Sequence, residues 1–228
     1  MTGSPLSLSE LLRPARHILL DFDGPVCSVF AGLSAVEVAE RLRGHLVAQD
    51  EHVPAEWSTE NDPVALLRRV ADSRPDLVPG VDAALTALEV EAVGMSQPTP
   101  GSGALLLACA ESKRSVSVVS NNSAAAITAF LAAHGLSGYV AGIFGRVPGD
   151  PSSMKPNPRL LLEAMEAEAS KPQQCIFIGD AARDVEAGEA AGVATIGYAN
   201  KPGKDVRLAN AGAAAVVDSM LLIANALA

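Results

Sequence analysis

The sequence predicts an α/β fold with a mainly parallel sheet and one all-helical insert. Short apolar stretches that resemble strands alternate with helical stretches, which is the pattern of strand–helix–strand crossover units. These strands are almost continuously apolar, as expected for a sheet covered on both faces. Residues 28–97 show helical periodicity and no clear strand pattern. We therefore expect a Rossmann-like three-layer core from residues 1–27 and 98–228, and a helical domain from residues 28–97.

The chain is expected to begin with a short helix at 7–12, which Pro14 stops, and a strand at 18–22. In the insert, Ser34 stands three residues before Glu37, the spacing of a capping box at the start of a helix. The apolar residues of this helix that we expect on one face are Val36, Ala39, Leu42, Leu46 and Val47.

Asp62-Pro63 predicts the start of a second insert helix, because aspartate is a good N-cap and proline suits the first helical position. A third helix is expected at about 80–92, and residues 97–101 form a stiff linker.

Strands and helices are expected to alternate after this linker. The expected helices are 102–111, one ending at Leu131, 159–167, 184–191, one near 206–209, and 220–227. The expected strands are 115–119, 175–178, 194–196 and 214–217. Phe144 and Gly145 are expected in a loop. Gly192 is expected to end the helix before it.

Composition limits the function classes. Hydrophobic residues make up 49% of the chain, so a sizeable core is expected. The formal net charge is -9, which argues against a general nucleic-acid binder because such a protein needs a basic surface. Three widely spaced cysteines suit a reducing compartment better than a disulfide framework. No signal peptide or membrane-spanning stretch is recognised. We expect a cytoplasmic monomer or homodimer.

Polar side chains follow three of the expected strands. They are Asp21 and Asp23, then Ser120 and Asn121, then Asp180 and Asp184. In parallel sheets, ligands bind beyond the carboxyl ends of the strands, so we expect these residues to converge. Alone, Asp23-Gly24 fits a surface turn equally well, Ser120 also fits a helix cap, and Asp184 also fits the N-cap of its own helix.

Four motifs stand in a fixed order along the chain. They are Asp21-Phe22-Asp23-Gly24, Ser120 after an apolar strand, Lys155-Pro156, and the segment from Gly179-Asp180 to Asp184. In this order they resemble the motifs of the haloacid dehalogenase-like phosphohydrolase superfamily, and the match extends over nearly the whole chain from about residue 17.

The resemblance implies a chemical role for each residue. Asp21 would be the nucleophile that forms an aspartyl-phosphate, and Asp23 the general acid and base. Ser120, Asn121 and Lys155 would bind the transferring phosphoryl group.

The resemblance also implies a Mg²⁺ cofactor. The ion would be held by Asp180 and Asp184, by Asp21, and by the backbone carbonyl of Asp23. The substrate would be a small phosphorylated metabolite, as for a phosphoglycolate phosphatase-like enzyme.

Two details refine this resemblance. Members of the superfamily that displace halide lack an acid two residues after the nucleophile, so Asp23 favours phosphoryl transfer. Pro25 departs from the usual threonine or valine, and we expect it to alter the turn without removing activity.

The insert matches the position and helical character of the superfamily's C1 cap. Arg41, Arg43 and Trp57 are candidate substrate contacts, although surface and packing roles are the more frequent ones for such residues.

Other functions fit part of this pattern. A phosphomutase of the beta-phosphoglucomutase type shares the catalytic residues. From another class, a signalling receiver domain also carries clustered aspartates, a hydroxyl and a lysine on a parallel sheet, but it lacks an insert of this size. A non-catalytic phosphate-binding or signalling protein could use the same fold. A dinucleotide site at Gly101-Ser102-Gly103 is disfavoured, because this segment follows a linker and lacks the third glycine.

Overall fold

The computed structural model, which describes residues 7–49 and 52–227, contains a six-stranded sheet in which every pairing is parallel. Its strands are β1 (His17–Leu20), β2 (Ser115–Ser123), β3 (Gly142–Arg146), β4 (Cys175–Gly179), β5 (Ala194–Tyr198) and β6 (Ala215–Val217). The strand order is β3-β2-β1-β4-β5-β6, so β1 is central. Leu20 lies opposite both Val118 of β2 and Ile178 of β4, which aligns the carboxyl ends of these three strands.

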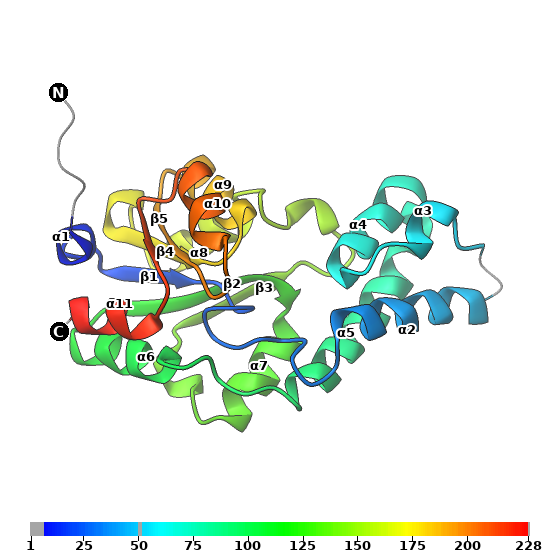
Figure 1. Cartoon of the computed structure of the whole chain (residues 1–228), viewed down its shortest axis with the longest axis horizontal. Helices are drawn as coiled ribbons and strands as arrows, with labels where there is room; N and C mark the ends of the chain where they lie inside the picture. Colours follow the sequence, from blue (N-terminus) through cyan, green and yellow to red (C-terminus); the bar gives the residue numbers. More distant parts are fainter. Residues whose placement is uncertain (1–6, 50–51, 228) are drawn as a thin grey trace.

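Helices cover both faces of the sheet, which confirms the three-layer α/β prediction (Figure 1). The helices outside the insert are α1 (Leu8–Leu12), α6 (Ser102–Glu111), α7 (Ala124–Ala133), α8 (Arg159–Ala167), α9 (Ala182–Ala191), α10 (Lys204–Asn210) and α11 (Met220–Leu227). Short 3₁₀ turns occur at Pro75–Leu77, Ser137–Tyr139, Pro151–Ser153 and Pro172–Gln174.

Strand β1 shows how the apolar sequence produces this layering. All four of its residues are buried. Ile18 and Leu20 join the core cluster beneath α6, α7 and α11, whereas Leu19 joins the cluster formed with α8 and α9. Successive side chains of a strand point to opposite faces, so a continuous apolar run is needed when both faces are covered.

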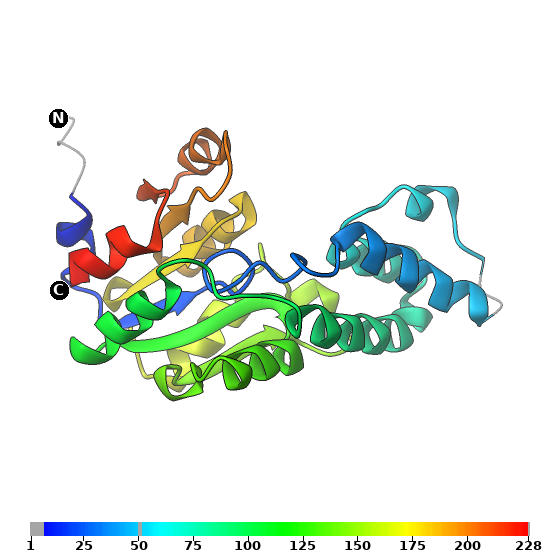
Figure 2. The ribbon, with the colours of Figure 1, turned by 60° about the horizontal axis from the view of Figure 1, so that its bottom comes forward.

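The insert between β1 and β2 is helical in its described part. It contains α2 (Ala35–Ala48), α3 (Ala55–Ser58), α4 (Pro63–Ser73) and α5 (Val78–Val93), which lie at one end of the molecule (Figures 1 and 2). Ser34 and Asp62 cap α2 and α4 as expected, each accepting a hydrogen bond from the first turn. The division of the chain into two domains at residues 28 and 97 stays a prediction.

The expected apolar face of α2 is partly wrong. Its buried residues are Val38, Ala39, Leu42 and Leu46. Val36 and Val47 are 44% and 61% exposed, because at about 3.6 residues per turn both lie well outside this stripe.

Two linkers connect the insert to the core and run side by side. Cys27 pairs with Pro98 in a short antiparallel bridge, and the amide of Thr99 donates to the carbonyl of Val26 at 2.8 Å. The Ser96 hydroxyl donates to the carbonyl of Val29 at 2.8 Å. The linkers thus support each other directly beside the first motif.

Strand β3 corrects the expectation of a loop around Phe144 and Gly145. Two glycines and partial exposure weaken its pattern, because β3 is an edge strand with only β2 as a neighbour. Ile143 lies opposite Val118 in register. Strand β2 also extends beyond the expected 115–119, so Ser120 and Asn121 lie within its last residues.

No helix in the described ranges combines the length and hydrophobicity needed to cross a membrane. The three cysteines are free thiols and buried.

Candidate active site

The site forms where the chain leaves β1 and β4. The Asp21 amide still donates to the carbonyl of Ile178 at 2.8 Å, so Asp21 begins the loop directly beside β4. The chain then turns sharply at Gly24, whose φ is +108°. A Cβ on Gly24 would lie 2.5 Å from Oδ2 of Asp180, so only glycine permits this approach of the two loops.

Pro25 fits this turn without losing a hydrogen bond that the turn uses. The turn is closed by the amides of Val26 and Cys27, which both donate to the carbonyl of Phe22 at 3.1 Å. The amide of Gly24 donates to the carbonyl of Cys27 at 2.6 Å. The backbone N–H that proline lacks at position 25 takes no part in these hydrogen bonds.

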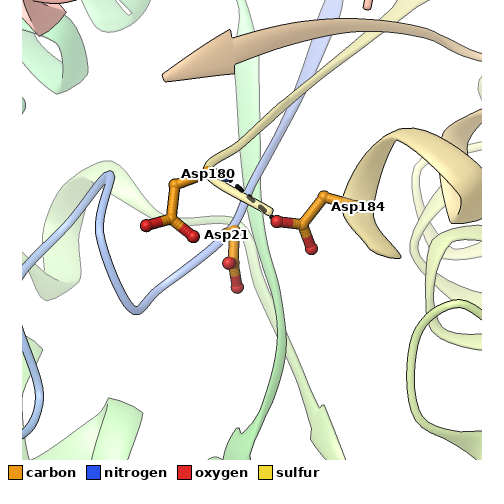
Figure 3. Close-up of side chains that lie close together, drawn as sticks. All are labelled: Asp21, Asp180 and Asp184. Carbon is orange, nitrogen blue, oxygen red and sulfur yellow. Dashed lines mark hydrogen bonds between the residues drawn. The ribbon is translucent and has the colours of Figure 1, made fainter. Parts of the chain in front are cut away.

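Three carboxylates meet beyond the carboxyl ends of β1 and β4 (Figure 3). One oxygen from each of Asp21, Asp180 and Asp184 lies within 4.8 Å of the others. Asp21 and Asp184 are buried, and Asp180 is half-buried. Such a group of anions repels itself unless a cation or shared protons neutralise it.

Lys155 supplies one cation from the loop between β3 and α8. Its Nζ lies 2.7 Å from Oδ1 of Asp21 and 2.8 Å from Oδ1 of Asp184, and it donates to the carbonyl of Val119 at 3.0 Å. The side chain is 1% exposed. Lys155 is therefore a buried partner of the Asp21 and Asp184 carboxylates.

Asn121 holds the Lys155 backbone in place. Its side-chain oxygen accepts from the Lys155 amide at 2.8 Å, and its side-chain amide donates to the Lys155 carbonyl at 3.1 Å. Arg68 of α4 also donates to that carbonyl, at 2.5 Å. Both polar atoms of the Asn121 side chain thus bind the Lys155 backbone.

Ser120 is buried and does not cap the next helix. Its hydroxyl lies 3.2 Å from both the amide and the side-chain oxygen of Asn122. The cap of α7 is Ser123, which accepts from the amide of Ala126. The capping alternative for Ser120 is therefore wrong, and its hydroxyl lines the smaller cavity described below.

Asp184 is not the N-cap of α9 but its third residue. Its Oδ2 accepts from the amides of Asp180 and Ala181, both at 3.0 Å, so the side chain reaches back to the start of the helix. A Cβ on Gly179 would overlap Asp184, which explains the glycine at the end of β4. One oxygen of Asp184 orders the loop while the other contacts Lys155.

Burial changes the acidity of the first motif. Burial and the neighbouring Asp184 carboxylate raise the pKa of Asp21 to about 7, although Lys155 opposes this. Burial raises the pKa of Asp23 to about 6, against the hydrogen bond from the Val29 amide at 2.9 Å. Burial alone would lower the pKa of Lys155, but Asp184 and Asp21 raise it. Lys155 therefore stays charged.

A divalent cation suits the carboxylate group. Hard cations such as Mg²⁺ prefer oxygen ligands, and Asp21, Asp180 and Asp184 offer several at close range. The Asp23 side chain lies outside this group, and a metal contact through the Asp23 backbone carbonyl stays a prediction. Oδ2 of Asp180 also contacts Nζ of Lys204 and accepts from the side-chain amide of Asn200 at 3.3 Å.

Two adjoining cavities open at the site. The smaller, of about 240 Å³, is lined by Asp21, Ser120, Asn121 and Lys155. The larger, of about 730 Å³, extends from Asp23 toward α10. Insert residues line the smaller cavity too, among them Phe30, Ala35, Asn61, Asp62 and Val64.

Arg41, Arg43 and Trp57 do not line either cavity. Arg41 pairs with Glu37 and Glu91 on the surface, and Arg43 donates to the carbonyls of Trp57 and Glu60. Trp57 is buried. The structure thus favours the surface and packing roles.

Sequence reasoning missed three side chains around the site, namely Arg68, Asn200 and Lys204. None stands in a motif, and only the fold brings them to the carboxyl ends of the strands. Arg183 is exposed and lies 4.0 Å from Asp62 of the insert.

Comparisons with known proteins agree with this geometry. A family model for haloacid dehalogenase-like hydrolases matches residues 15–192. A phosphoglycolate phosphatase from Photorhabdus laumondii is 25% identical over 210 residues, which cover 89% of this chain and 88% of the relative.

Solved structures share the fold. One, described as a "predicted phosphatase" from Clostridium acetobutylicum, has a TM-score of 0.72 at 19% identity and covers 92% of this chain and 97% of its own. CbbY from Rhodobacter sphaeroides, solved with phosphate, has a TM-score of 0.66 at 18% identity and covers 90% and 95%. With the family model spanning most of the chain, including all four motifs, the chain belongs to the haloacid dehalogenase-like hydrolase family.

Proposed function

We propose that the chain is a Mg²⁺-dependent phosphatase that hydrolyses a small phosphorylated metabolite through an aspartyl-phosphate on Asp21. The observation that carries this proposal is the contact of one buried lysine, Lys155, with both Asp21 and Asp184. It combines a carboxylate nucleophile, a fixed cation and a carboxylate group suited to a metal beside one cavity. Phosphoryl transfer needs this positioning and charge neutralisation.

In the first step, a carboxylate oxygen of Asp21 attacks phosphorus and the bond from phosphorus to the ester oxygen breaks. Asp23, as the carboxylic acid, donates its proton to that oxygen, so the product leaves as an alcohol. The raised pKa of Asp23, about 6 because of burial, makes the acid form accessible near neutral pH. Lys155 and Ser120 hold the phosphoryl oxygens.

In the second step, a water molecule attacks the phosphorus of the aspartyl-phosphate. The Asp23 carboxylate takes one proton from this water, which restores the acid form, and the bond between phosphorus and Asp21 breaks. Free phosphate and the Asp21 carboxylate are the products. Each residue returns to its starting state.

Asp21, Asp180, Asp184 and the Asp23 carbonyl would hold Mg²⁺. When bound, the ion would shield the anionic nucleophile from the anionic ester and stabilise the charge on the phosphoryl oxygens. Two relatives support a phosphorylated substrate. The relative from Photorhabdus laumondii is a phosphoglycolate phosphatase, and a mutant CbbY was solved with xylulose-(1,5)bisphosphate.

The experiment is turnover of a generic aryl phosphate by the purified protein. We expect Asp21→Asn to lower kcat by at least about 10³-fold, because the amide cannot act as the nucleophile. The same change at exposed Asp76 is the matched control and should leave kcat within about 2-fold. Unchanged turnover by Asp21→Asn would overturn the nucleophile assignment.

Product analysis separates a phosphatase from a phosphomutase. A phosphatase releases one phosphate for each sugar phosphate consumed, whereas a mutase returns the phosphoryl group to a sugar hydroxyl. We expect free phosphate as the main product. A sugar phosphate isomer as the main product would favour the mutase.

A further inference from the structure

The larger cavity concentrates positive charge in an acidic protein. The chain has a formal net charge of -9. The charged residues lining this cavity are nevertheless four basic ones, Arg183, Lys201, Lys204 and Arg207, and two acidic ones, Asp23 and Asp180. Asp180 belongs to the carboxylate group that suits a metal. The remaining positive charge points to an anionic ligand in the cavity.

Two of the four basic side chains are already occupied. Lys204 contacts Oδ2 of Asp180, and Arg183 lies 4.0 Å from Asp62. Among the residues that the structure describes, neither Lys201 nor Arg207 has a carboxylate within ion-pair distance. Lys201 and Arg207 are therefore free to bind an anion from outside the chain.

The position of this cavity relates it to the leaving group. Asp23, Phe30 and Ala35 line both cavities, so the two spaces meet at the proposed general acid. A phosphoryl group in the smaller cavity would present its ester oxygen to Asp23. The rest of the substrate would then extend into the larger cavity, toward Lys201 and Arg207.

Lys201 and Arg207 are held by the core and not by the helical insert. Both lie just after β5, Lys201 in the loop and Arg207 in α10. The buried side chain of Leu208 packs α10 closely against Gly197 of β5. Movement of the insert would leave this pair in place relative to Asp180.

We propose that Lys201 and Arg207 form a second anion site, which selects phosphate esters whose leaving group carries a carboxylate or a second phosphate. The inference rests on the proposed phosphatase function and names its substrate class. The volume of about 730 Å³ leaves room for a leaving group of sugar size. Residues of the α/β core, and not of the helical insert, would thus select the leaving group.

The first experiment measures binding, independently of turnover. The Asp21→Asn protein with Mg²⁺ is titrated calorimetrically with two matched pairs: 3-phosphoglycerate against glycerol 3-phosphate, and glucose 1,6-bisphosphate against glucose 6-phosphate. The first pair tests a carboxylate and the second a phosphate. We expect the anionic member of at least one pair to bind at least about 10-fold more tightly, as two charged contacts allow.

Adding Lys201→Gln and Arg207→Gln to this protein should reduce that preference to within about 2-fold. The matched control replaces Lys113 and Lys171 by glutamine, because these exposed lysines precede β2 and β4 at the opposite end of the sheet. It removes the same charge and should keep the preference. Equal binding within both pairs, or a preference that survives Lys201→Gln/Arg207→Gln, would overturn the inference.

A second experiment separates this failure from failure of the proposed function. Otherwise unaltered enzyme carrying Lys201→Gln/Arg207→Gln should hydrolyse an aryl phosphate with kcat/KM within about 2-fold of the original, because this substrate has no second anion. A larger loss of kcat/KM would show that Lys201 and Arg207 do more than bind the second anion. If the original protein hydrolyses no phosphate ester, the proposed function fails, and the binding comparison still judges the anion site.

Discussion

Asp21 and Asp23 stand one residue apart but have different partners. Asp21 faces Lys155 at 2.7 Å, whereas Asp23 accepts a hydrogen bond from the Val29 amide at 2.9 Å. Burial raises the pKa of both carboxyl groups, to about 7 for Asp21 and about 6 for Asp23, but at Asp21 the ammonium of Lys155 favours the attacking anion. Half-buried Asp23 lacks this contact and can carry a proton near neutral pH. The surroundings of the two side chains, and not their residue type, separate their tasks.

His17 provides a prediction for stability at the other end of β1. Its ring nitrogens each lie 2.9 Å from a serine hydroxyl, Nδ1 from Ser170 and Nε2 from Ser117. Burial lowers the pKa of His17, although Glu168 opposes this. The unfolded chain therefore binds a proton at a higher pH than the folded protein does. The contribution of neutral His17 is complete above about pH 6.5 and is lost as the pH falls below that value.

Urea unfolding of the protein and of His17→Gln between pH 5 and 8 measures this effect. The difference in free energy of unfolding should shrink on acidification, by at most about 1.4 kcal/mol per pH unit. Glutamine at exposed His52 is the matched control. A difference that stays constant from pH 8 to pH 5 would contradict the prediction.

The motif residues could be predicted from the sequence, because the proposed chemistry requires particular side chains beside strand ends. The support of Lys155 by Asn121 and Arg68 could not be predicted. These bonds join residues far apart in the chain, and they depend on how α4 and the loop before α8 meet.

A buried ion network joins the insert helix α5 to the ends of β2 and β3. Arg146, 3% exposed, lies 2.7 Å from Asp82 and 2.9 Å from Glu89. Glu89 also accepts from the side-chain amide of Asn122 and from the Ser123 amide. This network fixes α5 against the strand that carries Ser120.

Arg146→Met should lower the free energy of unfolding by about 3–5 kcal/mol, because it leaves two buried carboxylates without their cation. The matched control is Arg159→Met, which removes surface ion pairs and should change stability by less than about 1 kcal/mol. Denaturant unfolding monitored by circular dichroism measures both. A loss below about 1 kcal/mol for Arg146→Met would show that the network does not stabilise the fold.

Elements with long apolar runs or strong caps were the predictable ones. Asp62-Pro63 marked the start of α4, and Gly192, with φ +72°, ends α9. Strand β3 was missed because an edge strand with two glycines lacks the apolar continuity of its neighbours. The missed strand carries Arg146, so the ion network could not be predicted either.

For the whole molecule, the carboxylate group links metal binding to stability. A ligand that binds only the folded protein stabilises it by about 2.7 kcal/mol at a hundred times its Kd. We therefore expect saturating Mg²⁺ to raise Tm by about 5 °C or more, given that about 1 kcal/mol shifts Tm by a few degrees in a chain of this size.

Thermal unfolding with Mg²⁺, against KCl of equal ionic strength, checks this shift. Asp180→Asn should remove most of it, while Asp76→Asn, the surface control, should retain it. If Asp180→Asn keeps the full shift, Mg²⁺ stabilises the protein through other residues.

The overall architecture could be predicted because alternating elements and buried strands leave few topologies for a parallel sheet. The boundary between the cavities could not be predicted. The residues that line both cavities come from two distant segments, 23–35 and 180–183, and the fold decides which of their side chains meet. The motifs thus indicated the proposed chemistry, whereas the proposed second anion site could be inferred only from the structure.

The proposed mechanism requires Asp21 to become covalently phosphorylated. The most direct test uses the Asp23→Asn protein with Mg²⁺ and an aryl phosphate, whose good leaving group does not need the acid. Loss of the base should slow the second step, so the acyl phosphate accumulates. Acid quenching, reduction with borodeuteride and peptide mass spectrometry should find Asp21 converted to deuterated homoserine. Continued phosphate release without modification of Asp21, or modification of another residue, would rule out Asp21 as the nucleophile.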